Sequence, residues 1–533
     1  MMQKQTLVFF TVNSSFSHSS LALPMLHAAC RDLPQWHWER VDMTIAEDPA
    51  ETAVRIAEKQ PALVAADLYL FNRNTALDVL KRLHVLRPDC RIAVGGPECL
   101  GEGAVLLREE YPFLHALFRG EGERVFREYL LRFDPVKSGS IFPADGNAVY
   151  EEWNTAPFPA EDPFFCADKP FVQMETSRGC PMGCLYCTSG NTRTRFKELD
   201  QVSQELSLLR SKGVKEIRIL DRTFNLPESR GAALLRMFRE DFPDIRFHLE
   251  IHPQFLHEEL REELRQARHG QLHIEAGIQT LSPDVQKNIG RKSPPEDALA
   301  GLRFLTGCTA FETHVDLLAG LPGQTWNDLL RDVMTLCQAA PAEIQLEILK
   351  VLPGTPLRQI APEYGIRYAP DTPYDVMESD TMTAEEILNV RHFSRLLDLT
   401  YNHPDLHEAV RRMDLAALFT FFREQGGTFH TLFDLKKRFL FLAEFLTTAP
   451  DDRVLFCLAY HWLCAGYPLR QGPDRFSGKC EAPGPEYRLL SGDASCVTER
   501  ETKFVRLAYD GTDYILAYNR SYTFNRPAAV FVQ

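Results

Sequence analysis

The sequence lacks a long apolar run and lacks an excess of basic residues. One lysine precedes the first apolar stretch, which is too short for a signal peptide or a membrane span, and no small-residue cleavage site follows it. Lysine and arginine number 59 against 73 acidic residues, so the formal charge of −14 gives no general reason to bind nucleic acid or an anionic membrane. We therefore expect a cytoplasmic protein with no membrane span.

The chain also lacks the paired cysteines of a disulfide framework. Its 13 cysteines are an odd number, and most of them stand singly along the chain. This usage is typical of a reducing compartment. Internal repeats and low-complexity segments are absent as well, so 533 residues with 44% hydrophobic side chains predict an ordinary globular protein of roughly two to four domains.

Residues 1–132 alternate short β-rich apolar runs with helical patterns. This rhythm predicts an open parallel sheet, and ligands bind such sheets outside the carboxyl ends of the strands. Turn residues follow the expected strands at 13–20, 95–98 and 119–123. Residues 133–169 are rich in Pro, Gly, Asp and Ser without periodicity, which predicts a linker.

A second βα rhythm covers residues 170–358 and predicts a partial (β/α)6 barrel. Parallel strands buried on both faces read as continuous apolar runs, but several strands here alternate polar with apolar residues. We expect helices to cover the apolar face, so that the polar face lines a lumen and binds a polar ligand. The alternative is a solvated face of an antiparallel sheet, which the intervening helical segments disfavour. The polar positions are Gln173, Glu175, Ser177, His248, Glu250, His252, His273, Glu275, Gln279, His314, Asp316, Gln345 and Glu347.

Residues 359–533 differ in character from the rest. Apolar stripes at helical spacing and an aromatic-rich segment predict a mainly helical C-terminal domain. The end of the chain predicts a hairpin that turns at Asp510 and Gly511. The predicted fold is therefore α/β, with a Rossmann-like N-terminal domain, a partial barrel and a mainly helical C-terminal domain.

Cys180, Cys184 and Cys187 lie in the stretch SRGCPMGCLYCTSG, directly after an expected strand. Structural zinc takes four ligands, usually from paired two-residue knuckles, and the sequence has no second CxxC. Four thiolates would saturate a 4Fe-4S cluster, whereas three leave one iron free. The spacing therefore favours an iron–sulfur cluster. Zinc with a distant fourth ligand and incidental buried cysteines are the alternatives.

The CxxxCxxC spacing, with an aromatic residue before the third cysteine, resembles the radical SAM superfamily. The resemblance implies that the three cysteines bind a 4Fe-4S cluster and that its free iron binds S-adenosylmethionine. Reductive cleavage of S-adenosylmethionine would then yield a 5′-deoxyadenosyl radical that takes hydrogen from a substrate. Residues 272–292 resemble the family's fourth-strand region, and residues 314–325 resemble its glycine-rich fifth strand. The resemblance implies contacts to S-adenosylmethionine from Tyr186, Glu250, Glu275, Gln279 and Arg291.

Residues 1–132 resemble the domain that precedes the barrel in cobalamin-binding radical SAM enzymes. Small residues after the fourth expected strand would let the backbone approach a flat corrin and its nucleotide tail. Of the DxHxxG signature only the histidine is present, so His18 is either the lower axial ligand of cobalt or a loop residue near the cofactor. Asp67 stands where this class often has a small residue. The implied cobalamin contacts are Asn13, His18, Gly95, Gly96, Pro97, Glu98, Gly120, Glu121 and Gly122.

The whole chain resembles a cobalamin-binding radical SAM family with a C-terminal domain of unknown function. The resemblance implies an enzyme, namely a cobalamin-dependent methyltransferase acting on an unactivated carbon. A reductant such as flavodoxin or ferredoxin would supply electrons, and the substrate would be a small molecule, a peptide or an RNA. The alternatives are a tRNA methylthiotransferase-like radical SAM enzyme and a cobalamin or cluster sensor without catalysis. The acidic charge and helical tail disfavour the former, and the polar lumen disfavours the latter.

Overall fold

The computed structural model describes residues 4–134, 140–472, 477–498, 502–519 and 526–533. The chain divides into two compact units. The first comprises residues 1–312, 318–325 and 348–387, and the second comprises residues 313–317, 326–347 and 388–533. None of the helices in the described part of the chain combines the length and the apolar character that a membrane crossing needs.

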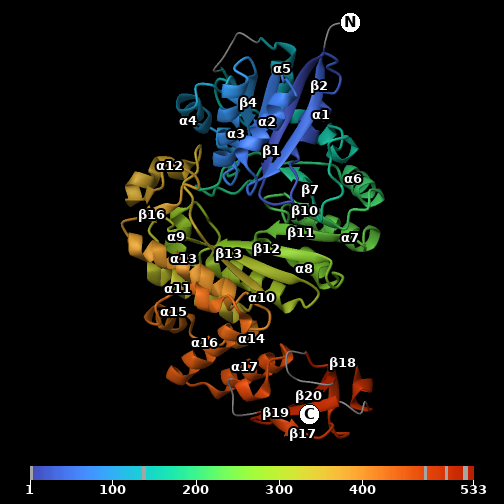
Figure 1. Cartoon of the computed structure of the whole chain (residues 1–533), viewed down its shortest axis with the longest axis vertical. Coiled ribbons are helices and arrows are strands. Elements are labelled where there is room, and N and C mark those ends of the chain that lie inside the picture. Colours follow the sequence, from blue (N-terminus) through green and yellow to red (C-terminus); the bar gives the residue numbers. More distant parts are fainter. Residues whose placement is uncertain (1–3, 135–139, 473–476, 499–501, 520–525) are drawn as a thin grey trace. The chain divides into compact units, whose positions relative to one another are not determined.

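The N-terminal part of the first unit is a parallel sheet with helices between its strands (Figure 1). The strand order is β2-β1-β3-β4-β5-β6, and each neighbouring pair is parallel. Edge strand β6 lies within the residues that the sequence predicts as a linker. Sequence reasoning missed it because a strand of three residues is too short to show a periodic pattern of apolar side chains. The elements are β1 (Gln5–Asn13), α1 (Ala22–Cys30), β2 (Trp36–Thr44), α2 (Pro49–Glu58), β3 (Leu63–Asp67), α3 (Arg73–Leu86), β4 (Arg91–Gly95), α4 (Gly103–Glu110), β5 (Ala116–Phe118), α5 (Gly122–Leu131) and β6 (Ser140–Phe142).

Helices cover both faces of this sheet. Val8 and Phe10 of β1 belong to one apolar core, together with residues of α2, α3 and α4. Leu7 and Phe9 belong to a second core with residues of α1 and α5. The sheet is therefore buried on both sides, and its polar groups can reach a ligand only at the strand ends.

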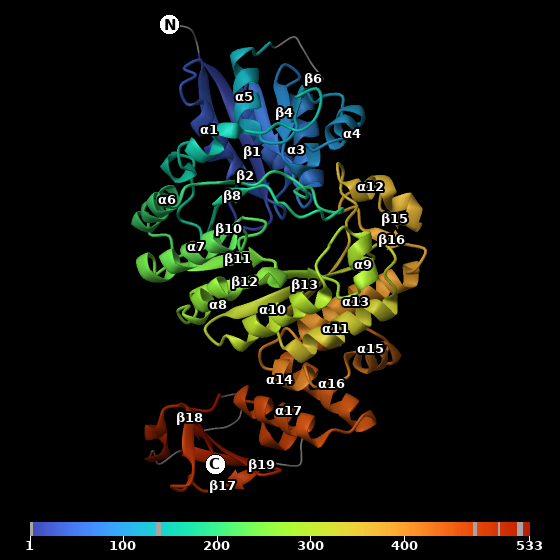
Figure 2. The same ribbon diagram turned by 180° about the vertical axis from the view of Figure 1, so that it is seen from behind.

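The barrel region follows the same βα rhythm. In the first unit, β7, β10, β11 and β12 are adjacent and parallel, and Figure 2 shows β10, β11 and β12 side by side. The small antiparallel pair β8 and β9 flanks the cysteine loop. The elements are β7 (Val172–Met174), β8 (Ser177–Arg178), β9 (Arg195–Phe196), α6 (Leu199–Ser211), β10 (Glu216–Ile219), α7 (Glu228–Asp241), β11 (Arg246–Ile251), α8 (Glu258–Arg265), β12 (Leu272–Gln279), α9 (Pro283–Asn288), α10 (Pro295–Gly307), β13 (Glu312–Ala319), α11 (Trp326–Ala339) and β14 (Glu343–Ile348).

The barrel strands alternate in burial, as the sequence predicts. In β12, buried apolar residues such as Ile274 and Ile278 alternate with partly exposed residues such as Glu275 and Gln279. Strand β11 has the same alternation after its exposed first residue. One face of these strands is therefore packed against apolar side chains, and the other carries polar groups along its whole length.

The C-terminal part has helices and one short antiparallel pair, β15 and β16, up to residue 464, and it ends in an antiparallel sheet of order β17-β19-β20-β21-β18. The predicted hairpin is confirmed: Tyr509 of β19 pairs with Thr512 of β20, and both turn residues have positive φ angles. The prediction of an α/β fold with a Rossmann-like N-terminal region, a second βα region and a mainly helical C-terminal region is also confirmed. The elements are α12 (Pro356–Ile360), β15 (Arg367–Tyr368), β16 (Val376–Glu378), α13 (Ala384–Leu399), α14 (His407–Val410), α15 (Leu415–Glu424), α16 (Leu435–Thr448), α17 (Asp452–Cys464), β17 (Ser477–Cys480), β18 (Arg488–Gly492), β19 (Thr502–Tyr509), β20 (Thr512–Asn519) and β21 (Ala529–Val532).

Candidate active site

A cavity of about 430 Å³ lies in the first unit, between the carboxyl ends of the N-terminal strands and those of the barrel strands. The N-terminal sheet contributes the ends of β3, β4 and β5 and the start of α5. The barrel contributes β7, part of the cysteine loop and the residues after β10. Cavities of this size hold small-molecule ligands. Six of the predicted cobalamin contacts line it: Gly95, Gly96, Pro97, Gly120, Glu121 and Gly122.

Two of these glycines have backbone conformations that other residues rarely adopt. Gly96 has a φ of +96°, and a Cβ atom there would lie 2.8 Å from the carbonyl oxygen of Leu68. Gly120 has a φ of +78°, and its Cβ atom would lie 2.4 Å from the carbonyl oxygen of Ala148. Both turns at the edge of the cavity therefore require glycine.

The other three predicted cobalamin contacts are not among the residues that line this cavity. Asn13 ends β1, beside Thr44 in the strand register. His18 Nδ1 lies 2.9 Å from the Ser15 hydroxyl, and burial, together with the charge of Arg218, lowers the pKa of this histidine. The Glu98 carboxylate accepts a hydrogen bond from a tyrosine outside the N-terminal sheet. Of the predicted cobalamin contacts, the residues of the glycine-rich turns thus line the cavity, whereas the polar residues Asn13, His18 and Glu98 do not.

Asp67 also lines the cavity, although sequence reasoning did not count it among the binding residues. Its carboxylate accepts hydrogen bonds from the hydroxyls of Thr11, at 2.7 Å, and Ser20, at 2.6 Å. Burial raises the pKa of Asp67 to about 6. An acid that ends a fully buried apolar strand is the signal that could have identified it.

The cysteine loop is closed by its own hydrogen bonds. The Cys180 backbone N–H donates to the Thr192 hydroxyl at 2.9 Å, and the Thr192 N–H donates to the Cys180 carbonyl at 2.9 Å. Cys180, Cys184 and Cys187 are free thiols. Burial raises the pKa of Cys187, and the neighbouring charges of Cys184 and Cys180 add to this effect. The loop that carries the three predicted ligands is thus fixed by hydrogen bonds between its two ends.

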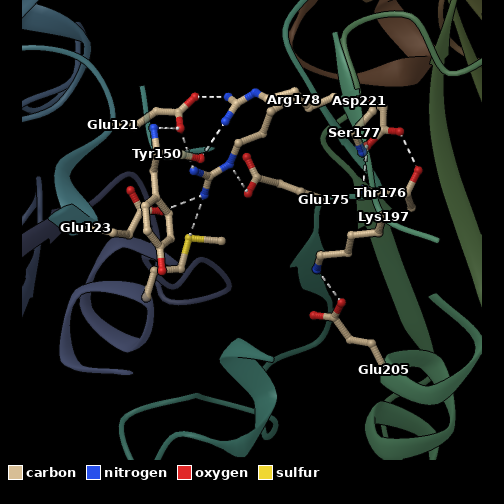
Figure 3. Close-up of polar contacts among 12 residues, drawn as sticks. Glu121, Glu123, Tyr150, Glu175, Thr176, Ser177, Arg178, Lys197, Glu205 and Asp221 are labelled. Carbon is tan, nitrogen blue, oxygen red and sulfur yellow. Dashed lines mark hydrogen bonds and ion pairs between the residues drawn. The ribbon is translucent and has the colours of Figure 1, made fainter. Parts of the chain in front are cut away.

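Asp221 fixes the start of this loop to the strand beside it. Its buried carboxylate accepts hydrogen bonds from the Thr176 N–H at 2.7 Å, the Ser177 N–H at 2.9 Å and the Thr176 hydroxyl at 2.5 Å (Figure 3). Asp221 follows β10, whereas Thr176 and Ser177 lead into the cysteine loop. Thr223, two residues further on, places its hydroxyl oxygen 3.2 Å from the Cys180 sulfur.

The residues predicted to bind S-adenosylmethionine form two groups. Glu250 and Glu275 are direct neighbours in the register of β11 and β12. A carboxylate oxygen of Glu275 lies 3.0 Å from His248 Nε2, and one of Glu250 lies 3.7 Å from Arg222. Burial raises the pKa of Glu250, and the adjacent Glu275 charge adds to the rise while Arg222 opposes it. These carboxylates therefore form one acidic patch on the polar face of the strands.

The second group lies nearer the cysteine loop. Burial raises the pKa of the Tyr186 hydroxyl, and the charge of Arg291 opposes this rise. The Arg291 guanidinium donates to the carbonyls of Gly277 at 2.8 Å and Ile278 at 3.0 Å. Gln279, beside these carbonyls, has a φ of +70°. Such a backbone is uncommon for a residue with a side chain and is typical of functional sites.

Sequence reasoning missed the ion network around Arg178. This buried side chain lies two residues before Cys180, and its guanidinium contacts three carboxylates: Glu175 at 2.9 Å, Glu123 at 2.8 Å and Glu121 at 3.3 Å (Figure 3). Arg195 also pairs with Glu121. The network ties the start of α5 to the cysteine loop. Residues from distant parts of the chain form it, so no local motif announces it.

Comparison with known proteins agrees with this geometry. Residues 174–336 match the radical SAM superfamily. These residues form a radical SAM domain. Residues 362–466 of the same chain match a family described as a protein of unknown function, DUF4080. The radical SAM domain therefore includes the cysteine loop, Asp221 and the acidic patch, and the DUF4080 region follows it.

Two curated relatives contain similar sequence. An uncharacterised methyltransferase of Pyrococcus horikoshii, PH0819, is 25% identical over 295 residues, which cover 51% of this chain and 62% of the relative. The cobalamin-dependent radical SAM methyltransferase TokK of Streptomyces tokunonensis is 21% identical over 349 residues, which cover 59% of this chain and 51% of the relative. The chain thus spans less than two thirds of the length of these relatives.

A solved structure resembles the fold over most of the chain. It is the cobalamin-dependent S-adenosylmethionine radical enzyme OxsB with aqua-cobalamin bound, which superposes with a TM-score of 0.60 at 14% identity. The match covers 86% of this chain and 79% of OxsB. At this level of identity the likeness shows a shared fold and nothing more specific.

Proposed function

We propose that the protein is a cobalamin-dependent radical SAM enzyme that transfers a methyl group to an unactivated carbon. The observation that carries the proposal is a cavity that the ends of both sets of strands line together, with part of the cysteine loop at its edge. The relative TokK is a cobalamin-dependent radical SAM methyltransferase, which supports the proposed cofactor and the transfer of a methyl group. We also propose the domain boundaries 1–132, 170–358 and 359–533, and the matched ranges 174–336 and 362–466 fit within the last two.

The residues at the cavity fit the proposed cofactors. Three free thiols on one glycine-containing loop suit a 4Fe-4S cluster that keeps one iron open. A Cβ atom on Gly190 would lie 2.7 Å from the Cys184 carbonyl oxygen, so the loop has the tight backbone that close wrapping requires. For cobalamin, the glycine turns at Gly96 and Gly120 and the apolar wall of Ala65, Ala66 and Val94 suit a large, flat ligand.

When bound, the cluster and S-adenosylmethionine would supply hydrogen abstraction, and cobalamin would carry the methyl group. The chain's own residues would bind and orient these groups. Cys180, Cys184 and Cys187 would ligate the cluster, and the neighbouring carboxylates Glu250 and Glu275 would accept hydrogen bonds from the amino group of S-adenosylmethionine. Tyr186, Gln279 and Arg291 would line the remaining part of that site, with Arg291 held in place by two backbone carbonyls.

The cysteines outside the loop argue against the methylthiotransferase alternative, which needs a second cluster in the N-terminal domain. Cys30 lies in the apolar core on one face of the N-terminal sheet. Cys90 and Cys99 lie in the core on the other face. The sheet separates them, so these three thiols cannot meet at one metal cluster. Their burial as free thiols also supports the proposal of a reducing cytoplasm, where flavodoxin or ferredoxin would be the electron donor.

Anaerobic reconstitution tests the proposal. We expect about four iron atoms and one cobalamin per chain. Dithionite and S-adenosylmethionine should give 5′-deoxyadenosine, measured by mass spectrometry. Cell extract with methyl-deuterated S-adenosylmethionine should give a product labelled in its methyl group. A chain that binds no cobalamin, or that binds about eight iron atoms, would contradict the proposal.

The three-cysteine variant C180A/C184A/C187A is the control for the cluster. It should bind no iron and form no 5′-deoxyadenosine while keeping its affinity for cobalamin. A chain that binds the cofactors but never cleaves S-adenosylmethionine would favour the sensor alternative.

A further inference from the structure

Glu98 was predicted to contact cobalamin, but its carboxylate is directed to two other side chains. Glu98 is 3% exposed and accepts a hydrogen bond of 2.8 Å from the Tyr374 hydroxyl. The guanidinium Nε of Arg73 lies 3.6 Å from the same carboxylate oxygen. Burial raises the pKa of Glu98, and the Tyr374 hydrogen bond and the Arg73 charge oppose that rise. A carboxylate this deeply buried depends on such partners.

The backbone around Glu98 belongs to the turn at the edge of the cavity. The Gly95 carbonyl accepts a hydrogen bond of 2.8 Å from the Leu68 N–H, and the Glu98 N–H donates 3.2 Å back to the Leu68 carbonyl. Leu68 directly follows Asp67, which lines the same cavity. Residues 95–98 and the end of β3 are therefore hydrogen-bonded to each other, and the side chain of Glu98 extends from this turn to residues outside the cavity.

Tyr374, which donates the hydrogen bond to Glu98, lies in the matched DUF4080 region. It has a φ of +60°, which is a rare conformation for an aromatic residue. Its carbonyl accepts a hydrogen bond of 3.0 Å from the Val351 N–H, and the Arg358 guanidinium lies over its ring, 5.5 Å from the ring centre. These contacts thus hold Tyr374 in an unfavourable backbone conformation in which its hydroxyl donates a hydrogen bond to Glu98. Such strain persists only where neighbouring contacts fix it.

A second contact joins the same two segments. A Cβ atom on Gly101 would lie 2.8 Å from the Cα atom of Gly354, so the two backbones touch. Arg358 Nε also lies 3.0 Å from a carboxylate oxygen of Glu102. The turn that contains Glu98 is consequently braced, along residues 98–102, by the segment from 351 to 374.

We propose that Tyr374 is a positioning residue that acts through Glu98 to hold the turn 95–98 against the cavity. The first part of the DUF4080 region then has a defined role, which is to brace from outside the turn that forms part of the cavity wall. The inference rests on the proposed function for the identity of the ligand. Its geometric part, the bracing of the turn, does not depend on the ligand.

Tyr374→Phe tests the inference, since it removes the hydroxyl and keeps the ring. In the full chain without cobalamin, amide hydrogen exchange of residues 95–100 should become about tenfold faster, because a hydrogen bond to a charged group is lost. The dissociation constant for hydroxocobalamin, measured by absorbance titration, should rise about five- to tenfold. Iron content and the affinity for S-adenosylmethionine should stay within about twofold, which a general loss of structure would not allow.

Tyr368→Phe is the matched control. Tyr368 lies in β15, and Arg358 packs over its ring at 5.4 Å. The described contacts of Tyr368 do not include Glu98, so this variant should leave both the exchange of residues 95–100 and the cobalamin affinity within about twofold of the wild type. Unchanged exchange in Tyr374→Phe, or an equal effect of both variants, would overturn the proposal.

Glu98→Gln separates the hydrogen bond from the charge. The amide oxygen can still accept from Tyr374, but the attraction to Arg73 is lost, so the effect should be smaller than that of Tyr374→Phe. The double variant should show less than the sum of the two single effects, since both changes weaken the same hydrogen bond between Tyr374 and Glu98. Additive effects would contradict an action through Glu98. If the wild type binds no cobalamin, the proposed function fails, and the exchange rates still decide whether Tyr374 holds the turn.

Discussion

The N-terminal sheet and the barrel sheet share a βα rhythm but use their strands differently. In β1 the last seven residues are all buried, whereas in β12 every second residue is partly exposed. A sheet with apolar cores on both faces can offer functional groups only at its strand ends, where Asp67 and the glycine turns lie. A sheet with one polar face can offer them along the strand, as Glu250 and Glu275 do. In the barrel, one face of each strand stabilises the fold and the other face presents polar groups to a ligand. In the N-terminal sheet, both faces stabilise the fold, and only the strand ends present groups to a ligand.

The largest effect should come from the apolar positions of both sheets. Phe10→Ala in β1 and Phe247→Ala in β11 each remove a fully buried ring, and Phe247 also stacks on Phe238 at 3.8 Å between ring centres. Each change should lower the free energy of unfolding by about 3–5 kcal/mol, as measured by chemical denaturation. Equal costs would show that the apolar face of the barrel strands is as essential as a two-sided core. If Phe247→Ala lowers the free energy of unfolding by less than about 1 kcal/mol, the apolar face of the barrel strands does not stabilise the fold as the core of the N-terminal sheet does.

The next effect concerns Asp67, the acid at the end of a fully buried strand. Its pKa is raised by burial from 3.8 to about 6 in the folded chain, so the folded state binds the proton more tightly than the unfolded state. This contribution to stability is complete below pH 4 and is lost as the pH rises through 6, by up to about 3 kcal/mol. Denaturation curves between pH 4 and 7 should show this loss relative to Asp67→Asn. A difference that grows in favour of the wild type with rising pH would contradict the sign.

A smaller effect on stability is expected from the polar face of the barrel. Glu275→Gln keeps the shape of the side chain and weakens the contact with His248, which is partly exposed. The free energy of unfolding should change by less than about 1 kcal/mol. The affinity for S-adenosylmethionine should nevertheless fall about tenfold, measured by calorimetry on the reconstituted chain. A large loss of stability with unchanged affinity would mean that this face is structural.

The smallest effect is expected on the outer surface of the barrel. Arg265 in α8 pairs with Glu258 and Glu262, and these side chains are substantially exposed. Arg265→Ala should change the free energy of unfolding by about 0.5 kcal/mol or less, because exposed ion pairs contribute little. Cofactor affinities should stay the same. This variant gives the background change against which the effects of the other four variants are measured.

Sequence patterns could predict the two βα regions, the alternation of the barrel strands and the cysteine loop. Each of these has a local signature: a period of two along a strand, turn residues at the strand ends, or three cysteines within eight positions. Local signatures also led to Gly95, Gly96 and Gly120, which line the cavity.

Contacts between distant parts of the chain could not be predicted in this way. Glu98 stands in a predicted binding turn, yet its partner Tyr374 is 276 residues away. Arg178 reads in the sequence as an ordinary residue before a cysteine motif, and its partners Glu121 and Glu123 lie at the start of α5 in the N-terminal region. Such pairings depend on the full packing of the chain, which no local period encodes.

The Arg178 network has a consequence for how this chain can change over evolutionary time. Loss of one partner from a buried ion network leaves an uncompensated charge, which commonly costs about 3–5 kcal/mol. Substitution at position 178 would therefore have to be accompanied by changes at 121, 123 or 175. The two sheets are thus not interchangeable modules: a recombined chain that joins this radical SAM domain to a foreign N-terminal domain would inherit half of the network and its unbalanced charge.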